Sequence, residues 1–181
     1  MAGLDVRSAP VVTPLDRALV QAVGDFCRWA AGADMPIQRG WANAVSRPRD
    51  SYVVVTPFGT TWQSTTTRSY TPGADGTGKL AVARSLSRRV QVDFYGPDAQ
   101  ALAQAVATLA QDLAGCTFFA PYALTPLIVT DPQELTGMVG SEQAQPRWMV
   151  EITLQPGPEF TGVSVDLDFF DNVNLGLHPQ A

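Results

Sequence analysis

The sequence has little of the chemistry that catalysis needs. Among its 181 residues are one histidine, His178, and two cysteines, Cys27 and Cys116. His178 lies beside Pro179 near the end of the chain, where a general base would lack the partners that orient it. A Ser-His-Asp triad, a Cys-His pair and a zinc site all lack parts, so we expect no catalytic, metal-binding or cofactor-binding residues. Two widely spaced cysteines also cannot form a small disulfide scaffold.

Charge is scarce too. Charged residues make up 16% of the chain, whereas an average soluble protein has roughly 25%. A surface with so few charges is compatible with one that partners cover in part. The formal net charge of −5 argues against tight nucleic-acid binding through a basic face. The sequence has no apolar run of about 18 residues, and Asp5 and Arg7 interrupt any signal peptide, so we expect neither a membrane span nor export.

Two helices are predicted from apolar residues that recur at three- and four-residue spacing. The first covers residues 13–31 and stops before Gly32, and the second covers residues 98–115 and stops at Gly115. Trp29 and Trp41 are expected to be packing residues rather than ligand platforms.

Alternating and β-branched segments predict an antiparallel sheet. Pro57 cannot donate to a strand ladder, so we expect the sheet to break or to reach an edge there. The predicted strands cover residues 51–57, a segment ending at residue 95, residues 147–155 and residues 163–170, with a possible short strand within 36–45. Residues 116–146 are predicted to form an irregular connection that contains one short strand.

Residues 59–86 are rich in threonine and aromatic residues but poor in large aliphatic ones. We interpret this segment as a β-hairpin arm that projects from the sheet, the alternative being a disordered surface loop. The predicted fold class is α+β, an antiparallel β-sheet flanked by two helices with this projecting arm. We divide the chain into one domain at residues 1–156 and a C-terminal strand and tail extension at residues 157–181.

Two short patterns resemble parts of ligand-binding motifs. Gly73, Gly78 and Lys79 have most of the spacing of a phosphate-binding loop, which makes a nucleotide-binding enzyme the alternative function. Lys79 is followed by Leu80 rather than by Ser or Thr, and the flanking segments look extended, so a turn between strands is favoured. The aspartates at positions 166, 168 and 171 lack the glycine and spacing of a calcium loop, so a solvated strand face is favoured.

Several segments together resemble the neck and tail terminator proteins of tailed bacteriophages. The resemblance runs from about residue 36 to residue 156, and its most specific pieces are "VQVDFYGP", "DPQEL" and "RWMVEITLQ". It implies a structural virion protein without enzymatic activity or cofactors, whose subunits form a ring, commonly a hexamer, between the head connector and the tail. The chain departs from the pattern at its glycine-rich hairpin tip and beyond Gln155.

The resemblance also implies the partners and the location. The partners are further copies of the chain, the head-tail connector, and tail tube or sheath proteins, with DNA only as passing cargo and no membrane. The protein is expected in the virion, at the neck or tail, after synthesis in the host cytoplasm. Another head-completion or tail-tube subunit is the structural alternative.

A ring subunit needs two different surfaces, because heterologous contacts repeated around an axis close into a ring. Aromatic and arginine side chains are frequent anchors of such interfaces. We therefore expect the arm and its base to carry protein-interface residues, namely Trp62, Arg68, Tyr70, Lys79, Arg84, Arg88 and Arg89.

Overall fold

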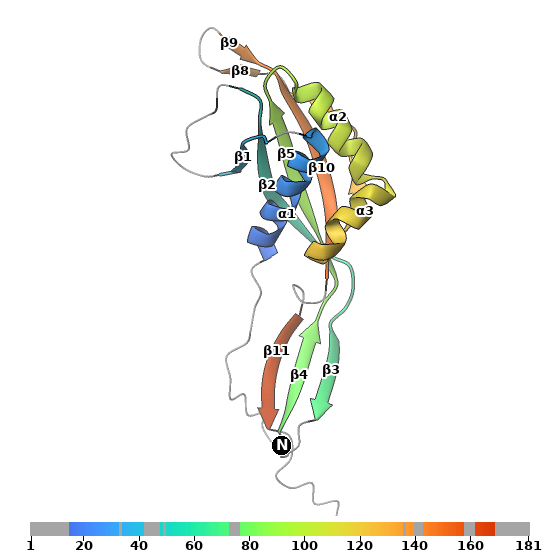
Figure 1. Ribbon diagram of the computed structural model, residues 1–181. Coiled ribbons are helices and arrows are strands. Elements are labelled where there is room, and N and C mark those ends of the chain that lie inside the picture. The colour runs from blue at the N-terminus through green and yellow to red at the C-terminus, as the bar shows by residue number, and fades with distance from the viewer. Residues whose placement is uncertain are drawn as a thin grey trace, which may run out of the picture.

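A computed structural model describes residues 15–32, 34–41, 48, 50–72, 77–135, 137–139, 143–157 and 162–168. Within these residues the fold is α+β, which confirms the predicted class. The described chain is elongated: helices cover a main sheet in the body, and a second sheet extends from the body at one end (Figure 1).

The main sheet has the strand order β1-β2-β5-β10-β6, and β7 also pairs with β10. All neighbours are antiparallel except β1, which runs parallel to β2. The strands are β1 (Ile37–Arg39), β2 (Tyr52–Trp62), β5 (Leu86–Tyr95), β6 (Leu124–Val129), β7 (Gln133–Glu134) and β10 (Arg147–Pro156).

The projection is a three-stranded sheet of order β11-β4-β3, which we call the arm sheet. Its strands are β3 (Thr67–Pro72), β4 (Thr77–Ala83) and β11 (Gly162–Asp168). The predicted arm therefore contains paired strands, but the C-terminal segment adds a third strand beside β4. The division of the chain at residue 156 stays a prediction. A short hairpin of β8 (Gly137–Val139) and β9 (Gln143–Gln145) lies at the opposite end of the molecule (Figure 1).

The described helices are α1 (Leu15–Ala31), α2 (Ala99–Ala110) and α3 (Leu113–Phe119), followed by the 3₁₀ turn η1 (Ala120–Tyr122). The prediction of one helix over residues 98–115 was wrong. Asp112 caps a new helix, its carboxylate accepting a hydrogen bond from the backbone N–H of Ala114 at 3.1 Å. Gly115 lies inside α3. A Cβ at this position would fall 2.7 Å from the carbonyl oxygen of Leu109, so the close contact requires glycine. The glycine thus permits a tight turn between two helices instead of ending one.

The connection predicted at residues 116–146 is also more ordered than expected. It contains most of α3 and the strands β6 to β9, and β6 forms an edge of the main sheet. The sequence predicted one short strand in this connection without placing it, because Pro126 interrupts β6 and its residues do not alternate in burial.

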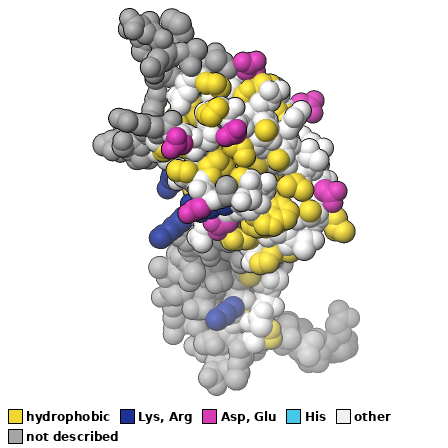
Figure 2. All heavy atoms as spheres, turned by 45° about the horizontal axis from the view of Figure 1, so that its top comes forward, with side chains coloured by type: hydrophobic (Ala, Val, Ile, Leu, Met, Phe, Trp, Pro, Cys, Tyr) yellow, Lys and Arg dark blue, Asp and Glu magenta, His cyan; other side chains and the backbone are white. Residues whose placement is uncertain are grey.

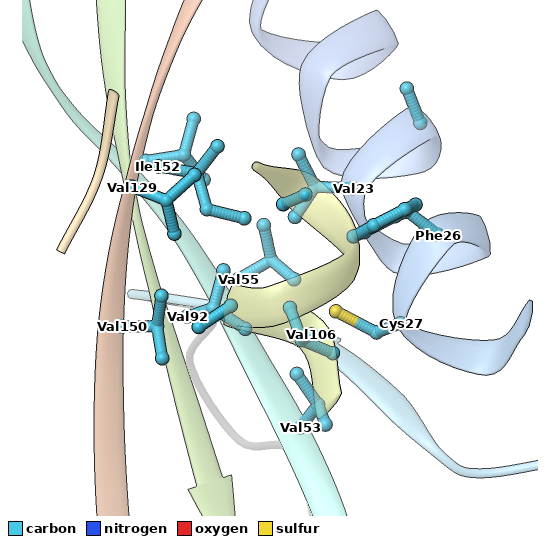
Figure 3. Close-up of a cluster of buried hydrophobic side chains, with 14 of the residues drawn as sticks. Val23, Phe26, Cys27, Val53, Val55, Val92, Val106, Val129, Val150 and Ile152 are labelled. Carbon is cyan, nitrogen blue, oxygen red and sulfur yellow. The ribbon is translucent and has the colours of Figure 1, made fainter. Parts of the chain in front are cut away.

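The core lies between the helices and one face of the main sheet (Figure 3). Val23, Phe26 and Cys27 of α1 and Val106 of α2 point toward valines of the strands. The alternation predicted for two strands is confirmed, since one side-chain parity is buried: Val90, Val92 and Phe94 in β5, and Val150, Ile152 and Leu154 in β10.

Strand β2 passes through Pro57 without ending, but its register with β5 shifts between Pro57 and Gly59. The parallel partner β1 ends at Arg39, which pairs with Val55, and the N–H of Gly40 then donates to the carbonyl of Val55 at 2.8 Å. Pro57 therefore comes where the strand on its β1 side has stopped, so its missing N–H breaks no ladder bond. The predicted disruption takes the form of a bulge, which does not end the strand.

A polar network lies on the sheet face that the helices leave open. Asp93, of which 3% is exposed, accepts hydrogen bonds from Arg147 at 2.9 and 3.1 Å and from Gln91 at 2.7 Å. The Arg147 guanidinium also lies over the ring of Tyr95, which stacks on Tyr52 with ring centroids 4.7 Å apart. Because Asp93 is buried, its carboxylate depends on these donors.

We expect Arg147→Ala to lower the free energy of unfolding by about 2 kcal/mol, because it leaves a buried carboxylate without its main partner. Arg89→Ala is the matched control: Arg89 pairs with Glu151 at 3.6 Å, and its side chain is 48% exposed. Its loss should cost below about 1 kcal/mol. Urea unfolding followed by circular dichroism measures both, and equal effects would contradict the role given to Asp93.

Candidate functional site

The phosphate-loop pattern does not form a phosphate-binding loop. Gly73 lies outside the described residues, whereas Gly78 and Lys79 are in β4, which pairs with β3 on one side and β11 on the other. The chain after Lys79 continues as a strand to Ala83. A phosphate loop needs a helix whose N-terminal N–H groups face the anion. The nucleotide-binding interpretation was therefore wrong.

The titratable groups offer no reactive centre in the part of the chain that the structure describes. No cluster of three His, Cys, Asp or Glu residues there could hold a metal ion. Cys27 is fully buried, and burial raises the pKa of its thiol to about 12, so it carries no nucleophilic thiolate near neutral pH. Cys116 is exposed and unpaired. His178 and Asp171 lie outside the described residues.

Beyond the helices, β2 and β5 continue as a ribbon toward the arm sheet. The Arg84 guanidinium lies over the ring of Trp62, 4.4 Å from its centroid, and Arg84 Nε donates to the carbonyl of Ser64 at 2.8 Å. The N–H of Gln63 donates to the carbonyl of Ser85 at 2.9 Å. These contacts fix the connection between the ribbon and the arm sheet, and they leave 53% of Trp62 exposed.

Strand β3 of the arm sheet presents its side chains to solvent. All six residues of β3 are exposed. The Tyr70 ring lies over Gly78, where an added Cβ would fall 2.2 Å from ring atoms, so the glycine makes room for the aromatic ring across the strand pair. Arg68 and Lys79 are exposed on β3 and β4.

The two arginines at the base of the arm are engaged within the chain. Arg88 forms an ion pair with Asp16 in the first turn of α1 and also donates to Thr60, and only 15% of its side chain is exposed. Arg89 lies over the Phe58 ring, 4.9 Å from its centroid, and pairs with Glu151. Of the seven predicted interface residues, Arg88 is thus held inside the subunit, whereas Trp62 and Tyr70 offer the most apolar surface.

Large hydrophobic side chains are exposed on the body as well. Figure 2 shows hydrophobic side chains gathered on the face that carries the helices. There, Trp29 and Leu113, which are 48% and 77% exposed, line a shallow hollow of about 460 Å³. Trp29 also packs on Phe26, as predicted for a packing residue. Trp41 was predicted to pack too, but 78% of it is exposed, so that prediction was wrong.

A comparison with protein families agrees with these features. The sequence model of one family, described as phage neck terminator protein, matches residues 17–180. No protein in the curated collection matches the chain. Because the family match covers most of the sequence, this chain belongs to the phage neck terminator family. The match includes the region beyond Gln155, which the sequence had suggested to be a departure from the family.

Membership makes the chain a structural protein of the phage virion that associates with other neck and tail proteins. Within the described ranges, no helix combines the length and apolar character that crossing a bilayer requires.

The two thiols should differ sharply in reactivity. We expect the native subunit to release one equivalent of chromophore with a disulfide reagent near pH 8, from exposed Cys116, and a second only after unfolding, because Cys27 is buried and its pKa is raised to about 12. Cys116→Ser should abolish the fast reaction. A native Cys116→Ser variant that still reacts quickly would show that Cys27 is accessible.

Proposed function

We propose that copies of this protein assemble into a ring, six-membered as the resemblance implies, which terminates the tail and joins it to the head connector. Family membership carries this proposal. The described surface supports it, because large hydrophobic side chains are exposed on the arm, on the helical face and at the sheet edges. A monomer with no partner would gain nothing from exposing them.

The arm is the part that we propose docks on a neighbouring subunit or an adjacent ring. Its sheet extends away from the helices, so its faces have no helix of this chain against them in the described residues (Figure 1). Among the described strands, β3 pairs only with β4, so its outer edge is open to a further strand. Trp62 and Tyr70 have the side-chain types that most often anchor interfaces.

The ring is tested by size-exclusion chromatography with light scattering, and by negative-stain imaging of the protein alone and mixed with tail particles that lack it. We expect a ring of about six subunits in solution or on the tail ends. A protein that stays monomeric and decorates no tail or connector particle under either condition would refute the proposed function.

For the arm, we expect the double substitution Trp62→Ala and Tyr70→Ala to lower binding to tail particles at least about tenfold, because hot-spot aromatics dominate interface energies. The matched control is Thr61→Ala with Thr71→Ala, two exposed positions on the same strands. Both variants should keep the circular dichroism spectrum and melting temperature of the parent. Equal binding by the two variants would show that the arm does not dock through its aromatic residues.

A further inference from the structure

The two edges of the main sheet differ from each other, and each exposes large side chains. At the β6 edge, Leu127 and Ile128 are 44% and 64% exposed. At the opposite edge, Trp41 follows β1 after Gly40, and 78% of it is exposed. Since the arm extends along the strand direction (Figure 1), these edges are the lateral surfaces of the subunit. A ring needs two such unlike surfaces on opposite sides of each subunit.

A bulge explains why two consecutive aliphatic residues are exposed in β6. Ile128 pairs with Thr153 and Pro126 pairs with Leu154, which leaves Leu127 as the extra residue. A strand normally turns successive side chains to opposite faces, but a bulge places one more residue on the outer side. The bulge thus displays Leu127 and Ile128 together at the sheet edge.

The same edge is closed to strand addition. Pro126 has no N–H to donate, and Gln111 Nε2 donates to the carbonyl of Val129 at 3.0 Å. Bulges and prolines at edges prevent pairing with another strand. A partner at this edge must therefore contact the side chains instead of extending the sheet.

At the β1 edge, the backbone at Gly40 and Trp41 leaves the tryptophan side chain exposed. Gly40 packs so closely on β2 that an added Cβ would lie 1.9 Å from Thr56 Oγ1. Trp41 then has a φ of 58°, so the backbone leaves the extended β conformation at this residue, and 78% of the tryptophan is exposed. Beside it, Arg39 is exposed and makes no ion pair with the described residues.

The charged residues of the two edges lie at the same height along the strands. Arg39 pairs with Val55, Val55 with Val92, and Val92 with Val150. The residue before Asp131 donates its N–H to the β10 residue just beyond Val150, so Asp131 comes level with Val150. Asp131 is exposed and, like Arg39, has no ion pair within the described residues.

The apolar residues match in height as well. Trp41 lies two residues beyond Arg39 and is therefore level with Pro57, whose row crosses β5 and β10 to Val129. Ile128 precedes Val129 in β6 and lies one residue farther along the sheet edge. A rotation about an axis along the strands, without rise, brings equal heights of neighbouring copies together. It would place arginine opposite aspartate, and tryptophan within one residue of isoleucine.

We propose that a second copy of this chain is the occupant of both edges: Arg39 and Trp41 of one subunit contact Asp131, Leu127 and Ile128 of the next. The charge complementarity of the edges and their equal heights favour this occupant over an unrelated partner. The contact rests on the proposed ring and specifies its lateral interface, in which side chains interlock and the sheets stay separate.

Cysteine cross-linking tests the contact in the full chain, with exposed Cys116 replaced by serine. The double variant Arg39→Cys with Asp131→Cys should give, on a denaturing gel after mild oxidation, a ladder that ends at the closed ring. Mixing the two single variants should give dimers only, because each subunit then has one reactive edge. Dimers formed by either single variant alone would indicate a two-fold contact and overturn the proposal.

Substitutions test the energetics of the contact. Ile128→Asp should weaken assembly at least about tenfold, whereas Thr108→Asp, at an exposed polar position on α2, should not. Arg39→Asp and Asp131→Arg should each weaken it about tenfold, and their combination should restore assembly to within about threefold.

The outcomes of these experiments distinguish an incorrect lateral interface from an incorrect proposed function. If the parent protein forms rings but the edge cysteines do not cross-link and Ile128→Asp assembles normally, this contact is wrong and the ring stands. If the parent forms no ring in solution or on tail particles, the proposed function fails and this interface fails with it.

Discussion

The antiparallel pairing of β2 with β5 is the interaction on which the rest of the molecule depends. It runs from Tyr52 opposite Tyr95 to Trp62 opposite Leu86. Half of this pair lies under the helices and supplies buried valines to the core. The other half passes beyond them and carries the arm sheet. One ribbon thus joins the body to the projection, so the direction of the arm is set by the main sheet.

The residue types along the β2–β5 ribbon change from core to arm because the helices cover only one part of the ribbon. Under the helices, an apolar parity such as Val90 and Val92 gains free energy by leaving water. At the N-terminal end of α1, the same face of β5 carries Arg88. Its charge is balanced by Asp16, and only 15% of its side chain is exposed. Farther out, no helix is present in the described chain, and β3 carries threonine, arginine and tyrosine in place of large aliphatic residues.

A protein of this kind acts through contacts with other proteins, and a surface with few charges is compatible with such contacts. Large apolar side chains remain exposed in three regions: the arm, the helical face and the sheet edges. Each region lies on a different side of the subunit, as expected for a component that contacts several neighbours at once. The edge strand β6 combines a proline and a bulge, which limit unwanted strand pairing, with aliphatic residues that remain available for a specific contact.

Sequence patterns predicted the elements whose signals are local. The helix at α1 and the alternation in β5 and β10 follow from periodicities of 3.6 and 2, because a buried face requires them. The resemblance to neck terminators rested in part on β5 and β10, and it is confirmed by the family match. The break between α2 and α3 was missed, since a run of alanines and leucines continues through it and only the capping by Asp112 reveals it.

The sequence alone therefore determined the fold class, the main helix and strands, and the absence of a familiar catalytic pattern. Only the tertiary structure decided which strands pair: β11 beside β4 in the arm sheet, and β6 at the edge beside β10. Strand pairing joins residues that are distant in the chain, so no local pattern encodes the partner. For the same reason, the height match between Arg39 and Asp131 exists only once four intervening strand pairings have set their register.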